Sequence, residues 1–254
     1  MANKFHFSEL FSYGITKEHD TQILNNSIPL DYAMEYGTQC HDPTKRIRYF
    51  DANPSFITDL SDLTHFKSLF NKTQLELLTF ILTVCNPVKR LHSSYYMEYK
   101  RSPETVYNIE DPNIFVKSIF NHTVSDKHRK YGYSFLNLGL FHKGLKRLQQ
   151  HFPKNQFLIL ESSFWFSHQN QTMEWLYHQL GFNRSDVYNN NIDSGTYHAF
   201  KNNVKKKQFD SDVVHLLQNY YVKDTNMLIN SLDHENILYF PHNRSKWRNS
   251  LLQY

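Results

Sequence analysis

The residues LLTFILTVCNPVKRLHSSYY, at positions 77–96, carry the clearest structural signal in this chain. The part from Leu78 to Val84 is a near-continuous run of β-prone residues, which is typical of a strand buried on both faces. A turn stiffened by Pro87 and a basic helix start follow it. Such a turn can seat an anion, because backbone N–H groups at a helix N-terminus favour negative charge and a nearby hydroxyl can bind it. A structural turn with a solvated Arg90 fits the same residues, so both interpretations stay open at this point.

Strand-like and helical stretches alternate along the rest of the chain. Further strands are predicted at 46–51 and 157–160. Helices are predicted from residue 61, from 141 to a stop at Pro153, from 173 to a stop at Gly181, and after Asp210. The alternation predicts an α/β fold with a mostly parallel sheet. In such sheets the chemistry gathers beyond the carboxyl ends of the strands, here after Phe50, Val84 and Leu160.

Size and composition predict one packed domain over residues 1–254, with 40% hydrophobic and 16% aromatic residues. The formal charge of +4 is mild and well short of that of a strongly basic nucleic-acid-binding protein. It would suit an anionic partner such as a nucleotide or a sulfated sugar. The residues predict no signal peptide and no membrane span, which taken literally indicates a cytoplasmic protein. Against this, six N-glycosylation sequons hint at a secretory history; they begin at Asn25, Asn71, Asn121, Asn170, Asn183 and Asn243.

Several classes of site are not predicted. The 15 histidines are scattered, and the sequence has no C-x-x-C and no H-E-x-x-H, so we expect no metal. It has no G-x-S-x-G, which disfavours a serine hydrolase. It has no G-x-G-x-x-G and no Walker loop, which disfavours dinucleotide enzymes and kinases.

The residues after the 78–84 strand resemble the 3′-phosphate-binding motif of carbohydrate sulfotransferases that use PAPS (3′-phosphoadenosine 5′-phosphosulfate), as in the heparan sulfate group. The motif is roughly R-[ND]-P-x-x-R-x-x-S-x-Y, and the residues that match in register are Asn86, Pro87, Arg90, Ser93 and Tyr95. Other segments resemble the family in the same order: 16–20, 48–56, 139–160 and 173–182. The resemblance covers about residues 14–232 and leaves 233–254 as a C-terminal extension.

The resemblance implies a P-loop-like three-layer α/β sandwich with a central parallel sheet. It implies transfer of a sulfuryl group from PAPS, without a metal, to a hydroxyl or amino group of a carbohydrate, glycosaminoglycan-like acceptor. It also implies a glycoprotein of the Golgi or secretory lumen, with no nucleic-acid partner.

Residue roles follow from the resemblance in the same way. Glu18 takes the place of the carboxylate that removes the proton from the acceptor hydroxyl, although an ordinary surface glutamate fits it too. Lys17 and Asp20 beside it would contact the acceptor.

The donor nucleotide would lie at a second set of residues. Ser93 would bind its 3′-phosphate, and Arg90 would stiffen this region or add positive potential. Lys205 and Lys206 take the place of a basic loop that covers the nucleotide.

Departures from the family pattern leave open whether the protein is an active enzyme. Cys85 stands where the family has an arginine that pairs with the 3′-phosphate, and a thiol lacks that charged fork. Loss of such a bond costs about 1.5–3 kcal/mol, so donor binding is expected to be tens- to hundredfold weaker. The family's first strand and its K-x-G-T-[TS] loop, which holds the 5′-phosphosulfate, have no counterpart before Gly14.

Three explanations of these departures remain open. The chain is a fragment, or a degenerate inactive relative, or a partner chain completes its sheet. The alternative function is a non-catalytic module that binds an anionic glycan or nucleotide.

Overall fold

The computed structural model describes residues 63–64, 67–68, 72–76, 78–101, 103–123, 125–181, 206–234 and 237–253. The chain divides into two compact units, Met1–Glu76 and Leu77–Tyr254. The first contains the short helix α4 (Lys72–Glu76) and the buried Leu63 of the predicted helix from residue 61. The second contains the sheet and all the elements below. The predicted strand at 46–51 lies outside the described residues.

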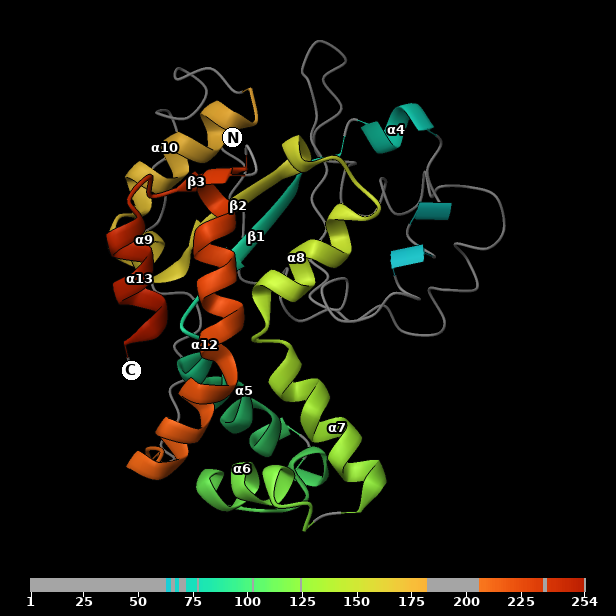
Figure 1. The fold of residues 1–254 in the computed structure, drawn as a ribbon, viewed down its shortest axis with the longest axis vertical. Helices are drawn as coiled ribbons and strands as arrows, with labels where there is room; N and C mark the ends of the chain where they lie inside the picture. Colours follow the sequence, from blue (N-terminus) through green and yellow to red (C-terminus); the bar gives the residue numbers. More distant parts are fainter. Residues whose placement is uncertain are drawn as a thin grey trace, which may run out of the picture. The chain divides into compact units, whose positions relative to one another are not determined.

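Three parallel strands form the sheet of the second unit in the order β1-β2-β3 (Figure 1). They are β1 (Phe80–Val84), β2 (Phe157–Glu161) and β3 (Leu238–Phe240). β1 pairs with β2 over its whole length, and all five residues of β2 are buried, as expected of a strand with neighbours on both sides. The predicted α/β class, the parallel sheet and the first two of these strands are confirmed.

The third strand was not predicted. β3 is three residues long and lies in 233–254, beyond the region that resembles the sulfotransferase family. It pairs with the side of β2 opposite β1, with Ile159 opposite Tyr239. Residues 237–253 therefore belong to the sheet and its packing.

Eight α-helices accompany the strands among the described residues of this unit. Their bounds are α5 (Pro87–Arg101), α6 (Pro112–Phe120), α7 (Asp126–Asn137), α8 (Phe141–Gln149), α9 (Ser162–Ser167), α10 (Gln169–Gln179), α12 (Ser211–His234) and α13 (Arg244–Leu252). Two short 3₁₀ turns, Pro103–Val106 and Lys154–Gln156, complete the set. None of the helices in the part of the chain that the structure describes has the length and apolar character needed to cross a bilayer.

The predicted helix ends agree with the structure to within a few residues. The helix after Asp210 is α12, and its apolar positions Val213 and Leu217 are fully buried. α10 ends just before Gly181, whose φ of +76° is the left-handed conformation that glycine adopts at helix ends. α8 ends at Gln149, earlier than predicted, and backbone bonds from the N–H groups of His151 and Phe152 to the Leu148 carbonyl continue its last turn toward Pro153.

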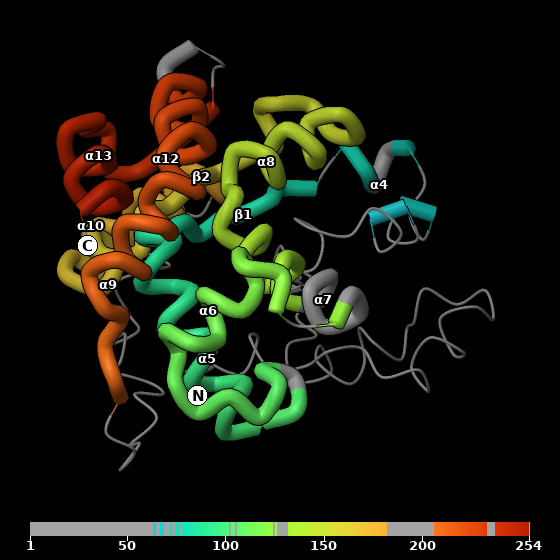
Figure 2. Tube along the Cα trace, turned by 60° about the horizontal axis from the view of Figure 1, so that its bottom comes forward, coloured from blue at the N-terminus to red at the C-terminus, as the bar shows by residue number. Residues whose placement is uncertain are grey.

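The main apolar core joins α5, α6, α7 and the first half of α12 (Figure 2). It is rich in aromatic rings, with Tyr95, Phe115 and Tyr221 buried at its centre. Figure 2 shows α5 and α6 together in green, below β1, the strand that leads into α5. This core holds α5 rigidly, so that the residues on its outer face keep a defined position at the end of β1.

Candidate nucleotide site at the end of β1

The turn between β1 and α5 is organised by Asn86, which is 4% exposed. Its Oδ1 accepts hydrogen bonds from the backbone N–H groups of Val88 and Lys89, both at 3.0 Å. This is the N-cap arrangement that asparagine favours. Pro87 follows in the first helical position, where its lack of a backbone N–H removes no hydrogen bond from the helix.

The other end of the Asn86 amide binds a distant segment. Nδ2 donates to the carbonyl oxygens of Ser250, Leu251 and Gln253, at 3.4, 3.1 and 3.0 Å. Carbonyl groups at a helix end have no partner within the helix. Asn86 therefore joins the start of α5 to the end of α13 across more than 160 residues of sequence.

These bonds change the expected form of the anion seat. The N–H groups of Val88 and Lys89 bind the Asn86 side chain, and that of Arg90 binds the Asn86 carbonyl at 2.9 Å. The first turn of α5 thus has its backbone donors satisfied within the protein. A phosphate at this turn would depend on side chains and not on the backbone cradle that the sequence suggested.

Ser93, the predicted ligand of the 3′-phosphate, has an exposed side chain. It lies in the second turn of α5. Lys89, one turn earlier, is also exposed, and residues four apart share a helix face. A hydroxyl donor and an ammonium group therefore lie on one side of α5, close to the end of β1.

Arg90 points into the protein. Its Nη2 donates to the Phe135 carbonyl oxygen at 2.7 Å, and its Nη1 lies 3.5 Å from the Ser94 hydroxyl. Among the described residues its buried Nε has no hydrogen-bond partner. Of the two roles the sequence left open, this geometry fits the one in which Arg90 stiffens the region, by tying α5 to the end of α7.

Cys85 provides no positive charge at the end of β1. Burial, with the Glu161 carboxylate nearby, raises the pKa of its thiol to about 11, although Arg90 acts in the opposite direction. The thiol is therefore neutral at pH 7. The described residues supply part of what a 3′-phosphate needs, a hydroxyl and surface cations, but no guanidinium fork.

The neutral thiol leads to a direct test by alkylation with iodoacetamide at pH 8. A rise in pKa from 9.0 to about 11 lowers the thiolate fraction about a hundredfold, and the thiolate is the reactive form. In a Cys40→Ser variant, where Cys85 is the single thiol, we expect native protein to react at least about a hundredfold more slowly than protein unfolded in urea. Mass spectrometry over time gives both rates. Native and unfolded rates within a few-fold of each other would contradict the environment described for Cys85.

The basic segment predicted to cover the nucleotide is fixed against α5. Tyr96 binds the Lys207 backbone twice, accepting from its N–H at 2.6 Å and donating to its carbonyl at 3.0 Å. His92 Nε2 lies 2.8 Å from the same carbonyl oxygen. The Lys207 ammonium pairs with Asp111 at 2.5 Å.

This contact brings Lys206 to the helix that carries Ser93. The Lys206 ammonium lies 5.9 Å from the centre of the Tyr96 ring, a cation–π distance. Tyr96 is three positions after Ser93, so the two are neighbours on the helix surface. Two parts of the predicted nucleotide site, which lie more than 100 residues apart in the chain, thus meet α5 within one helical turn of each other.

Four of the predicted site residues lie outside the described residues: Glu18, Lys17, Asp20 and Lys205. The site also contains a residue that the sequence analysis missed. Glu161, the last residue of β2, is buried and accepts from the N–H groups of Ser163 and Phe164, at 2.9 and 2.6 Å, and from the Ser250 hydroxyl, at 2.6 Å. Its signal in the sequence was its place directly after the apolar run 157–160.

Metal ligands do not gather in the described residues. No group of three histidine, cysteine, aspartate or glutamate side chains lies in position to hold a metal ion in that part of the chain.

Comparison with solved structures gives a distant likeness. No protein-family model matches the sequence, and no curated protein matches it. Among solved structures, the chain is similar to a sulfotransferase from Alicyclobacillus acidocaldarius, with 17% sequence identity and a TM-score of 0.42. The match covers 67% of this chain and 57% of that protein, a little over half of its length. A likeness of this extent transfers no residue role, so the function proposed below depends on the side chains described above.

Proposed function

We propose that this protein binds the 3′-phosphate of PAPS on the outer face of α5 and transfers its sulfuryl group to a hydroxyl or amino group of a carbohydrate acceptor. The observation that carries the proposal is the attachment of the 206–207 segment to α5 beside Ser93. It brings the Lys206 ammonium over Tyr96, in the third turn of α5, and so to the same helix that carries Lys89 and Ser93 in its first two turns after β1. Ligands of parallel α/β sheets bind at the carboxyl ends of the strands.

The residues named so far take the following parts in this proposal. The Ser93 hydroxyl donates to a phosphate oxygen, and Lys89 and Lys206 supply positive potential around it. Arg90 positions α5 through the Phe135 carbonyl and does not contact the ligand. When bound, PAPS supplies the sulfuryl group. Glu18, as the resemblance implies, takes the proton of the acceptor hydroxyl, with Lys17 and Asp20 at the acceptor.

The neutral thiol of Cys85 favours a second candidate. Where the related motif has a permanent cation, this chain has an uncharged group, and Arg90 does not replace it because its guanidinium is turned inward. A protein that holds a nucleotide or an anionic glycan without catalysing transfer is consistent with such weak phosphate binding.

Calorimetric titration of the full chain with PAP, the desulfonated nucleotide, tests the binding step. We expect Ser93→Ala to weaken PAP binding about tenfold or more, because a hydrogen bond to a charged group contributes about 1.5–3 kcal/mol. Lys89→Ala should also weaken it, whereas Lys100→Ala, an exposed lysine at the far end of the same helix, should not. 5′-AMP, which lacks the 3′-phosphate, should bind the parent protein and the Ser93→Ala variant equally.

Cys85→Arg is the complementary variant. We expect it to strengthen PAP binding about ten- to hundredfold, while Cys85→Met, which adds length without charge, should not. Equal affinities for PAP in the parent, Ser93→Ala and Cys85→Arg proteins would show that the phosphate does not bind here. PAP binding without sulfuryl transfer to any saccharide would favour the second candidate.

A secretory location belongs to the same proposal. The three described sequon asparagines, Asn121, Asn170 and Asn243, are exposed, as attachment of a glycan requires. Expression in a secretory host and digestion with an endoglycosidase would detect glycans at these positions.

A further inference from the structure

An exposed methionine continues the surface of α5 that carries Ser93. Lys89, Ser93 and Met97 follow one another at intervals of four residues, and all three are exposed. Residues four apart share a helix face, so these three form one stripe along α5. Met97 is 46% exposed, whereas the apolar side chains of Tyr95 and Tyr96 directly before it are buried.

The chemical character of the stripe changes on the two sides of Ser93. Lys89, one turn before it, is a cation, and Met97, one turn after it, is an uncharged thioether. Four residues of helix span about 6 Å. A nucleoside 3′-phosphate carries its phosphate and its base on the same ribose ring, so the two groups are separated by a similar distance. A phosphate at Ser93 can therefore bring the base to Met97, the apolar neighbour on the stripe.

The helix around Met97 is held firmly in place. The Tyr96 hydroxyl accepts from the Lys207 N–H at 2.6 Å and donates to the Lys207 carbonyl at 3.0 Å. Its ring packs edge-on against Tyr95, with ring centres 5.0 Å apart, and the Lys206 ammonium lies over it. Met97 thus extends a flexible, polarizable side chain from a rigid backbone, and such a side chain can adapt to a flat ring.

We propose that Met97 contacts the nucleobase, and that it packs on the flat face of the base and not against its edge. The inference rests on the proposed position of the 3′-phosphate at Ser93. A thioether is only a weak acceptor, so it contributes affinity through packing and does not read the hydrogen-bonding groups at the base edge. Every base presents such a face. Met97 therefore strengthens binding of a purine nucleotide without selecting which purine it is.

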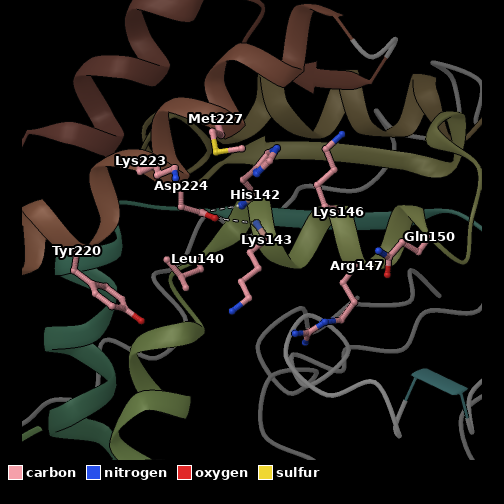
Figure 3. Close-up of a pocket in the computed structure, with 10 residues that line it drawn as sticks. All are labelled: Leu140, His142, Lys143, Lys146, Arg147, Gln150, Tyr220, Lys223, Asp224 and Met227. Atoms are coloured by element: carbon pink, nitrogen blue, oxygen red, sulfur yellow. Dashed lines mark hydrogen bonds between the residues drawn. The ribbon is translucent and has the colours of Figure 1, made fainter.

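Oxidation by dilute hydrogen peroxide tests this contact without any substitution. Met97 and Met227 are 46% and 45% exposed, so we expect comparable rates of sulfoxide formation in the free protein. Met227 lies on α12, where it lines a different pocket beside His142 of α8 (Figure 3). Saturating PAP should slow the oxidation of Met97 about tenfold or more and leave that of Met227 unchanged. Mass spectrometry measures both sites in the same sample.

Calorimetric titration of the full-length Met97→Ala protein gives the corresponding change in affinity. We expect PAP to bind about three- to tenfold more weakly, because the contact between sulfur and ring is lost. Guanosine 3′,5′-bisphosphate should lose affinity by the same factor. Met97→Leu, which keeps an apolar side chain of similar volume, should retain most of the affinity.

Ile114→Ala is the matched control for the loss of an exposed apolar side chain. Ile114 lies on α6, outside the stripe, and is 57% exposed. This variant should bind PAP as the parent protein does.

The base contact and the phosphate site can fail separately. If Ser93→Ala weakens PAP binding but Met97 is neither protected nor needed for affinity, the base lies elsewhere; the inference is then wrong and the nucleotide site stands. Loss of affinity for PAP alone, with the guanosine nucleotide unaffected, would contradict a contact through the face of the base. If PAP does not bind the parent protein, the proposed function fails and the base contact fails with it.

Discussion

Replacing Trp247 with alanine should lower the free energy of unfolding of the 77–254 unit by about 3–5 kcal/mol. The Trp247 side chain is fully buried, and its Nε1 donates to the Pro241 carbonyl oxygen at 2.8 Å. The Tyr239 ring packs edge-on against it, with ring centres 5.9 Å apart. The substitution leaves a cavity between β3 and α13 and removes one of the two hydrogen bonds to the Pro241 carbonyl, which keeps its bond from the Asn243 N–H. The cavity accounts for most of the expected loss.

Guanidinium unfolding followed by circular dichroism measures this loss, because the signal does not depend on the tryptophan that is removed. Trp165→Ala is the matched control: Trp165 is half-buried and stacks on the exposed Phe166, so we expect a much smaller change. Equal stabilities of the Trp247→Ala and Trp165→Ala proteins would mean that residues 237–253 do not pack as described.

Asn86→Ala should destabilise the same unit by about 2–4 kcal/mol. Loss of an N-cap costs about 0.5–2 kcal/mol. Buried polar groups left without a partner add about 1–3 kcal/mol, and the affected groups here are the N–H of Val88 and Lys89 and the carbonyls that end α13.

Asn86→Asp tests separately the contacts made by the oxygen and by the nitrogen of the Asn86 amide. The aspartate retains the acceptor for Val88 and Lys89, but it places a carboxylate against the carbonyl oxygens of Leu251 and Gln253. We therefore expect Asn86→Asp to be destabilised as well, and hydrogen exchange to increase at α13 more than at α5. All three tryptophans lie in this unit, so their fluorescence reports its unfolding. An Asn86→Asp protein as stable as the parent would show that the contact with α13 contributes little.

Local signals were sufficient for much of the fold. The apolar run at 78–84 and the shorter one at 157–160 predicted β1 and β2, because an uninterrupted β-prone run is what a central parallel strand requires. The stop at Gly181 was predicted because a left-handed residue after a helix favours glycine. β3 was missed because three residues are too few to show a period, and it becomes a strand through pairing with β2.

The candidate site was predicted in its parts and not in its geometry. Ser93 lies on the surface of α5 and Lys206 reaches the same helix, but the direction of Arg90 could not be read from its neighbours. An arginine after a turn can face solvent or the interior, and the choice depended on the Phe135 carbonyl 45 residues away.

From its amino acids alone, this chain can be recognised as an α/β protein with a parallel sheet and a turn after the 78–84 strand that resembles a phosphate motif. These features arise from the spacing of apolar residues and from turn chemistry, which act over a few positions. Folding added the third strand, the inward arginine, the neutral thiol and the double contact of Asn86. These features depend on tertiary contacts between carbonyl groups, charges and apolar surfaces that are far apart in the sequence. No local sequence pattern encodes such contacts.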